Sequence, residues 1–64
     1  MKWIDVSGIA AQLADVHPKI DPTRVNFVDL MNRVKALPDF DDDPARCSER
    51  VLEAIQQAWI EEMD

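Results

Sequence analysis

The residues with the clearest potential for chemistry are three consecutive aspartates, Asp41, Asp42 and Asp43, between Phe40 and Pro44. Carboxylates this close repel one another, so the cluster calls for an explanation. Negative charge ahead of a helix stabilises the helix N-terminus by about 0.3–1 kcal/mol per group. Carboxylate oxygens also bind hard cations, and an acidic surface attracts basic partners. Helix capping, metal binding and partner docking are therefore all open at this point.

The aspartates have the right chemistry to bind a metal ion, but the sequence lacks the spacing of a known metal-binding motif. The run lacks the glycine and the twelfth-position glutamate of an EF-hand loop, and the chain has no His-x-x-Glu or Cys-x-x-Cys pair. A site built from carboxylates alone would suit Mg, Ca, Mn or ferrous iron, and would be exposed, weak and poorly selective. The candidate ligands are Asp41, Asp42, Asp43 and Glu49.

Helix capping explains only part of the charge. The next helix starts near Ser48, with four residues between it and Asp43, whereas the dipole effect fades within one turn. Glu61, Glu62 and Asp64 follow at the end of that helix, where carboxylates oppose the dipole. A solvated acidic face without a specific role is a further interpretation, because charge runs commonly face solvent.

The charge is unevenly distributed along the chain. The formal net charge is −6, and residues 38–64 hold nine acidic and two basic residues, which gives −7. Residues 1–37 hold four acidic and five basic residues, which gives +1. A field of this sign repels phosphate backbones and attracts basic protein surfaces or cations. We therefore expect no nucleic-acid partner.

Two further side chains have catalytic potential. His17 precedes Pro18 at the end of a helix, where a partly protonated imidazole would suit the dipole, and a ligand or general-base role is the alternative. Cys47 is the only thiol, and we interpret it as a small helix-start residue. One distant histidine gives a nucleophile little support, so we expect no enzyme.

Three amphipathic helices position these residues. The first is predicted from Asp5 as N-cap to His17, the second from Asn26 to Pro38, and the third from Ser48 to Glu61, with fraying at Glu62. In the connector between the first two helices, Asp21 as cap and Pro22 in the first-turn position predict a short turn. Residues 23–27 are β-branched or aromatic at three positions, which leaves a short extended piece there as a further option. The two tryptophans and two phenylalanines are expected in the core or at its edge.

The chain is thus predicted to be one small all-α domain, residues 1–64. It has no apolar run of the length that crosses a bilayer and no apolar leader segment, and its single cysteine suits a reducing interior such as the cytoplasm. We expect a monomer that binds no membrane.

The order of residues resembles the IscX family, also called YfhJ, of bacterial iron–sulfur cluster assembly. The matching positions run over nearly the whole chain, and the most specific part is the segment from Phe40 to Pro44. They are Trp3, Asp5, Ile9, Leu13, Pro18, Asp21, Pro22, Val25, Phe27, Asp29, Phe40, Asp41, Asp42, Asp43, Pro44, Glu49, Leu52, Glu53, Ala54, Ile55, Trp59 and Glu62.

The resemblance implies a modified winged-helix-like fold without a true DNA-binding wing. It implies binding to the cysteine desulfurase, a PLP enzyme that mobilises sulfur, at a site overlapping that of the frataxin homologue. It also implies weak binding of ferrous or ferric iron by surface carboxylates, with no tightly bound cofactor, in the bacterial cytoplasm.

The leading hypothesis is a non-enzymatic adaptor or regulator of the desulfurase. Its partner-binding surface is predicted to contain Asp39, Asp41, Asp42, Asp43, Glu49 and Glu53, and secondarily Asp29 and Glu61. Changing Asp41, Asp42 and Asp43 to lysine is expected to abolish desulfurase binding without unfolding the domain. The alternatives are a donor of ferrous iron and a generic acidic protein-interaction domain. A nucleic-acid-binding winged helix has only fold resemblance in its favour.

Overall fold

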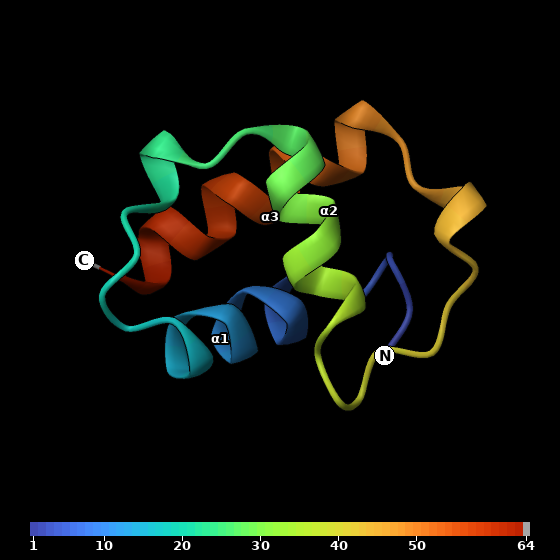
Figure 1. The fold of residues 1–64 in the computed structure, drawn as a ribbon, viewed down its shortest axis with the longest axis horizontal. Coiled ribbons are helices and arrows are strands. Elements are labelled where there is room, and N and C mark those ends of the chain that lie inside the picture. The colour runs from blue at the N-terminus through green and yellow to red at the C-terminus, as the bar shows by residue number, and fades with distance from the viewer. Residues whose placement is uncertain (64) are drawn as a thin grey trace.

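The structure, a computed structural model, describes residues 1–63 of the chain. Its elements are α1 (Val6–Val16), the 3₁₀ turn η1 (Pro22–Arg24), α2 (Phe27–Lys35), the 3₁₀ turn η2 (Pro44–Arg46) and α3 (Glu49–Glu62). These 63 residues contain no strand, so the predicted all-α, three-helix domain is confirmed (Figure 1). None of the helices they form is long and apolar enough to cross a membrane. The winged-helix relationship stays an implication of the resemblance.

The first helix begins and ends where its flanking residues predict. Asp5 is the N-cap of α1, and His17, followed by Pro18, is its C-cap. The Asp5 carboxylate makes no capping hydrogen bond, however. It accepts a hydrogen bond from the backbone N–H of Lys2 at 2.9 Å, and the Asp5 N–H donates to the Lys2 carbonyl at 3.0 Å. Asp5 therefore closes the turn that brings the N-terminal residues to the helix.

The connection between α1 and α2 contains the predicted short turn, the 3₁₀ turn η1, with Asp21 as its N-cap and Pro22 as its first residue. The Asp21 carboxylate caps this turn, accepting from the Thr23 backbone N–H at 3.0 Å and hydroxyl at 2.7 Å. Of residues 23–27, the buried Val25 and the following Asn26 have extended backbone, so the extended piece is limited to the end of the connection. The Gln56 side chain of α3 donates to the carbonyls of Pro22 and Val25 at 2.8 and 3.0 Å, which fixes the connection against α3.

The second helix starts as predicted but ends earlier. Its N-cap is Asn26, whose side-chain oxygen accepts from a backbone N–H three residues on at 2.8 Å. We predicted that Pro38 would close the helix, yet the C-cap is already Ala36. The Leu37 N–H donates to the carbonyl of Val34, three positions back, which tightens the last turn. Leu37 nevertheless reaches the core and is 3% exposed.

The third helix is longer than predicted. Ser48 is its N-cap and accepts from the Val51 backbone N–H at 3.2 Å. The helix continues through Glu62, where fraying was expected, and the Glu62 side chain is exposed. The predicted fraying is therefore wrong, since a helical Glu62 turns its carboxylate to solvent and leaves no charge in the core.

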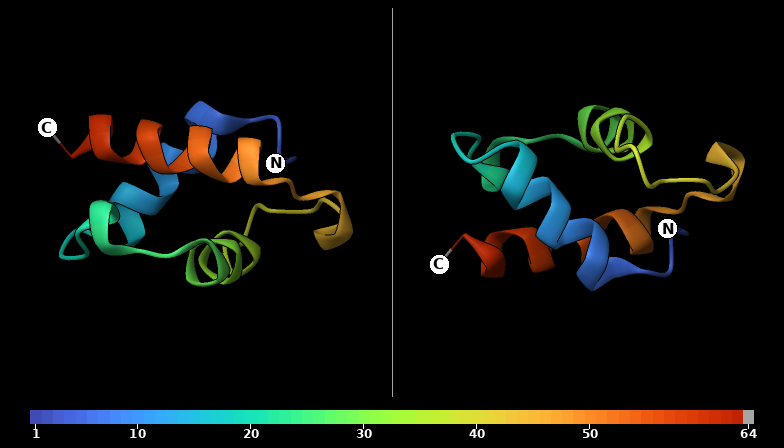
Figure 2. Two further views of the ribbon diagram at one scale, coloured as in Figure 1. Left: turned by 90° about the horizontal axis from the view of Figure 1, so that it is seen from above. Right: turned by 90° about the horizontal axis from the view of Figure 1, so that it is seen from below.

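The core lies between α1 and α3, which share the largest helix interface, and α2 runs crosswise against them (Figures 1 and 2). Phe27 and Phe40 pack at its edge, which confirms the predicted place of the aromatic residues. The buried side chains are Trp3, Ile9, Ala10, Leu13, Val25, Leu30, Val34, Leu37, Leu52, Ile55 and Trp59. Because Trp3 belongs to this core, the N-terminal residues are held beside the connection between α2 and α3 (Figure 1).

Candidate functional site

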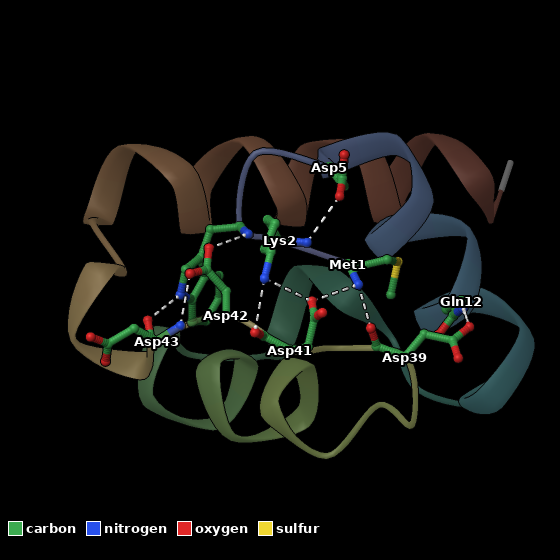
Figure 3. Close-up of polar contacts among 9 residues, drawn as sticks. Met1, Lys2, Asp5, Gln12, Asp39, Asp41, Asp42 and Asp43 are labelled. Atoms are coloured by element: carbon green, nitrogen blue, oxygen red, sulfur yellow. Dashed lines mark hydrogen bonds and ion pairs between the residues drawn. The ribbon is translucent and has the colours of Figure 1, made fainter.

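The acidic loop, residues 39–43, leads from α2 to η2, and the N-terminal residues lie against it (Figure 3). The Met1 ammonium forms an ion pair with the Asp41 carboxylate at 3.0 Å and donates to the Asp39 carbonyl. The Lys2 ammonium donates to the Asp41 carbonyl at 3.1 Å and lies 3.4 Å from the Asp41 carboxylate. The Asp41 N–H donates to the Met1 carbonyl at 3.0 Å. These contacts join residues that are 38 to 40 positions apart in the chain.

Asp42 is the half-buried aspartate of the loop, and both of its carboxylate oxygens are used within the fold. One accepts from the backbone N–H of Trp3 at 3.0 Å (Figure 3). The other accepts from the backbone N–H of Asp43 at 2.7 Å. The Asp42 side chain therefore acts as an internal acceptor for two backbone donors.

Asp43 and Phe40 complete the enclosure of Trp3. The Asp43 carbonyl accepts from the Trp3 indole N–H at 2.9 Å, while its carboxylate caps η2 by accepting from the Ala45 N–H at 2.9 Å. The Phe40 ring meets the indole edge-on, with 4.7 Å between centroids. Pro44 is exposed, so Phe40 alone holds the loop to the core by apolar contact.

Asp39 faces α1 from the start of the loop. Its carboxylate accepts from the Gln12 side-chain amide at 2.8 Å, between two exposed groups (Figure 3). Asp39 therefore adds a contact from the loop to α1 while its outer surface stays accessible.

The same contacts hold the pKa of two loop carboxyls below the usual range. For Asp41 the leading cause is the hydrogen bond from the N-terminal ammonium, followed by the one from Lys2. For Asp42 the leading cause is the hydrogen bond from the Trp3 N–H, followed by that from the Asp43 N–H. Both carboxyls are ionised at neutral pH, and much of their charge is already compensated by neighbouring donors.

The glutamates of α3 lie apart from the acidic loop. Successive residues of an α-helix are about 100° apart, so Glu49 and Glu53 each point about 160° away from Val51 around the axis of α3. Val51 lines a surface groove together with Asp42. Glu49 and Glu53 are exposed on the opposite flank of the helix. The predicted acidic residues thus form two regions, not the single surface that we expected.

The two secondary candidates differ from each other. The Asp29 carboxylate is ion-paired with Arg33 at 3.3 Å, one helical turn along α2. Glu61 is exposed in the last turn of α3, and within residues 1–63 no side-chain partner is recorded for it. Of the two, Glu61 is the freer to meet a partner.

The surroundings of His17 disfavour the charge expected for a histidine at a helix C-terminus. Burial lowers its pKa, and the neighbouring Arg33 guanidinium lowers it further. The Arg33 Nη1 lies 3.3 Å from the ring Nδ1, where a neutral imidazole accepts the hydrogen bond. Both the lowered pKa and the Arg33 donor favour a neutral His17 that acts as a structural acceptor, and they disfavour the expected interaction of a charged imidazole with the helix dipole.

Cys47 is half-buried at the end of η2, directly before the N-cap of α3. Burial raises the pKa of its thiol. Since the thiolate is the reactive form of cysteine, a raised pKa disfavours nucleophilic chemistry at neutral pH. The position agrees with the predicted helix-start role.

Comparison with known proteins gives the chain its family. The family model described as iron-sulphur cluster assembly matches residues 1–64. The chain belongs to the iron–sulphur cluster assembly family. It is also 59% identical over 64 residues to an uncharacterized protein of Pseudomonas aeruginosa, a match covering 100% of this chain and 97% of the relative. These matches confirm the resemblance to the IscX family.

For this member of the iron–sulphur cluster assembly family, the geometry does not provide a preformed metal centre. Within residues 1–63, no group of three or more histidine, cysteine, aspartate or glutamate side chains is placed to hold a metal ion. The predicted ligands Asp41, Asp42 and Asp43 each accept hydrogen bonds inside the fold, and Glu49 stands on α3. Metal binding by these residues stays a prediction. A metal ion would bind either to a single exposed carboxylate or to a loop in which the aspartates have given up their internal hydrogen bonds.

Three residues of the loop's surroundings were not singled out from the sequence. They are Met1, Lys2 and Gln12, which supply cations and an amide to the loop. The sequence contained one indication of this arrangement, a lysine next to a tryptophan near the start of the chain. If Trp3 is buried, the residues beside it must also lie close to the core. In this family member the acidic loop therefore fixes the N-terminal residues to the fold as well as presenting negative charge.

Proposed function

We propose that this protein is a non-enzymatic adaptor or regulator that binds the cysteine desulfurase of the cluster-assembly machinery through exposed carboxylates. The observation that supports the proposal is a set of exposed carboxylates that make no polar contact with the described part of the chain. Glu49, Glu53 and Glu61 are exposed on α3, and no side-chain hydrogen bond or ion pair is recorded for them within residues 1–63. Family membership supplies the context of cluster assembly.

The carboxylates differ in whether contacts within the fold already engage their oxygens. Asp42 and Asp43 serve chiefly to hold Trp3 and η2, so their oxygens are already engaged. Asp41 keeps a side chain that is 66% exposed despite its ion pairs, and Asp39 is exposed beside it. We therefore assign the partner contacts mainly to Glu49 and Glu53, with Asp39 and Asp41 as a second contact region.

Charge complementarity of this kind favours fast association with a basic surface of the partner and a strong dependence on salt. Replacing Glu53 by lysine is expected to weaken desulfurase binding about tenfold, which equals about 1.4 kcal/mol. The measurement is calorimetric or interferometric titration of the purified desulfurase at low salt and at about 0.15 M salt, where the screening length is about 8 Å.

The matched control is Glu62→Lys, which makes the same charge change on the same helix at a residue outside the predicted contact set. Glu62 is exposed, as Glu53 is, so neither change disturbs the core. Equal binding by Glu53→Lys and Glu62→Lys would contradict the assignment of Glu53 to the interface. Absence of binding by the unaltered protein at low salt would overturn the proposed function itself.

Iron binding is a secondary part of the proposal, and we expect it to be weak and unselective. A donor of ferrous iron needs several ligands held together, whereas residues 1–63 contain no such group. We expect calorimetric titration with ferrous ion to give little heat, and excess magnesium to displace the ion. A stoichiometric site that resists magnesium would favour the donor function over the regulator.

A further inference from the structure

A second surface feature lies on the flank of α3 opposite Glu49 and Glu53. It is a groove of about 390 Å³ formed where the N-terminal turn meets η2 and α3. We call it the N-terminal groove, and its lining residues are Lys2, Trp3, Ile4, Asp42, Arg46 and Val51. None of the predicted contact residues except Asp42 belongs to it.

The groove is apolar along one side. Trp3 is buried and rigidly held by its two hydrogen bonds to the acidic loop, so it forms a fixed wall. Val51 is half-buried in the first turn of α3. Ile4 is 83% exposed, the most exposed of the large hydrophobic residues. An isoleucine in that position contributes little to the core, whereas it can cover an apolar group placed in the groove.

The charge of the groove is opposite to that of the molecule. Its cations are Lys2 and Arg46, and its one acid is Asp42. The Lys2 ammonium is already ion-paired with Asp41, so Arg46 is the cation left for a ligand. Both oxygens of Asp42 already accept backbone hydrogen bonds, so Asp42 is poorly placed to satisfy a further cation. Within residues 1–63 the structure records no ion pair for Arg46, although it lies close enough to Asp42 to lower the pKa of that carboxyl.

We propose that the N-terminal groove binds a segment of a partner protein in which a bulky aliphatic residue lies next to an acidic one. The aliphatic side chain packs between Ile4 and Val51, over the small exposed edge of Trp3, and the carboxylate pairs with Arg46. A bidentate carboxylate–guanidinium pair fixes the orientation, and burial of the aliphatic group supplies the affinity. The net charge of −6 disfavours polyanions such as nucleic acid, whereas a single carboxylate can meet Arg46. This surface goes beyond the proposed function because it selects the opposite charge through different residues.

The test uses peptide probes on the intact protein, so it does not depend on desulfurase binding. The probes are acetyl-Ser-Leu-Glu-Ser-amide, its Leu-Lys counterpart and its Ala-Glu counterpart. In ¹H–¹⁵N NMR titrations we expect saturable shifts at the Trp3 indole and the Ile4 and Val51 amides with the Leu-Glu peptide, at millimolar affinity for so small a ligand. The Leu-Lys and Ala-Glu peptides are expected to bind at least about threefold more weakly.

Two variants and one control locate the binding. Ile4→Ser and Arg46→Glu are expected to reduce Leu-Glu affinity about threefold or more, because they remove the apolar cover and the cation. Val28→Ser is the control, since Val28 is 67% exposed on α2 and outside the groove. All three sites are exposed, so the fold is preserved. The proposal is overturned if the Leu-Glu peptide gives no saturable shifts at the groove, or if the three peptides or the three variants behave alike.

Discussion

Replacing Trp3 by alanine is expected to remove most of the free energy that keeps this domain folded. Trp3 is 2% exposed, and truncation of a buried tryptophan costs about 3–5 kcal/mol. A domain of 64 residues has a total stability of roughly 3–10 kcal/mol. The change also removes the indole N–H that donates to the Asp43 carbonyl. In urea unfolding followed by circular dichroism, we expect a much lower midpoint or no folded baseline.

Two controls separate packing from hydrogen bonding at Trp3. Trp3→Phe keeps an aromatic ring against Phe40 and loses the donor to Asp43, so we expect a loss of about 1–2 kcal/mol. Ile4→Ala changes the next residue, which is 83% exposed, and is expected to stay within about 0.5 kcal/mol of the unaltered protein. If Trp3→Ala unfolds at the same urea concentration as Ile4→Ala, the N-terminal segment is not part of the cooperative core.

The helices were predictable because their signals are local. Asn26 and Ser48 are N-caps in the sequence and in the structure, since each side chain accepts from an N–H three residues away. The end of α2 was misplaced because apolar spacing continues to Leu37 while the backbone leaves the helix at Ala36. The spacing of apolar residues predicts which side chains are buried, and Leu37 is indeed buried. It does not show whether a buried residue still belongs to the helix, and Leu37 does not.

The role of the acidic loop was not predictable in the same way. The sequence showed three carboxylates and suggested cations or a basic partner, but their actual donors are largely backbone N–H groups and the chain terminus. The contact of Asp42 with Trp3 spans 39 positions, so it depends on the tertiary fold. By contrast, the exposure of Glu49 and Glu53 followed from their place on an amphipathic helix. The charge of a residue was readable from the sequence, but whether the fold uses that charge was not.

This difference changes the expected outcome of charge reversal. Replacing Asp42 by lysine is expected to destabilise the domain strongly, because it removes the acceptor of two backbone N–H groups and places a third cation near Lys2 and Arg46. The triple replacement of Asp41, Asp42 and Asp43 by lysine is then expected to unfold the protein, so lost binding would not identify an interface. Thermal unfolding measures the effect, and Glu53→Lys is the matched control, expected within about 0.5 kcal/mol. Equal melting temperatures for Asp42→Lys and Glu53→Lys would contradict a structural role for the loop.

The pH dependence of Asp42→Asn tests the same role without reversing a charge. The folded-state pKa of Asp42 lies below its usual value, chiefly because the Trp3 N–H donates to the ionised carboxylate. A lowered pKa means that the contribution is present above the unfolded pKa of about 3.9 and is lost as the pH falls through the folded value. Asparagine offers one acceptor and no charge, so Asp42→Asn should unfold at lower urea than the unaltered protein at pH 7. We expect the gap between the two urea midpoints to shrink as the pH falls below about 4, whereas a gap unchanged between neutral and acidic pH would show that the Asp42 charge does not stabilise the fold.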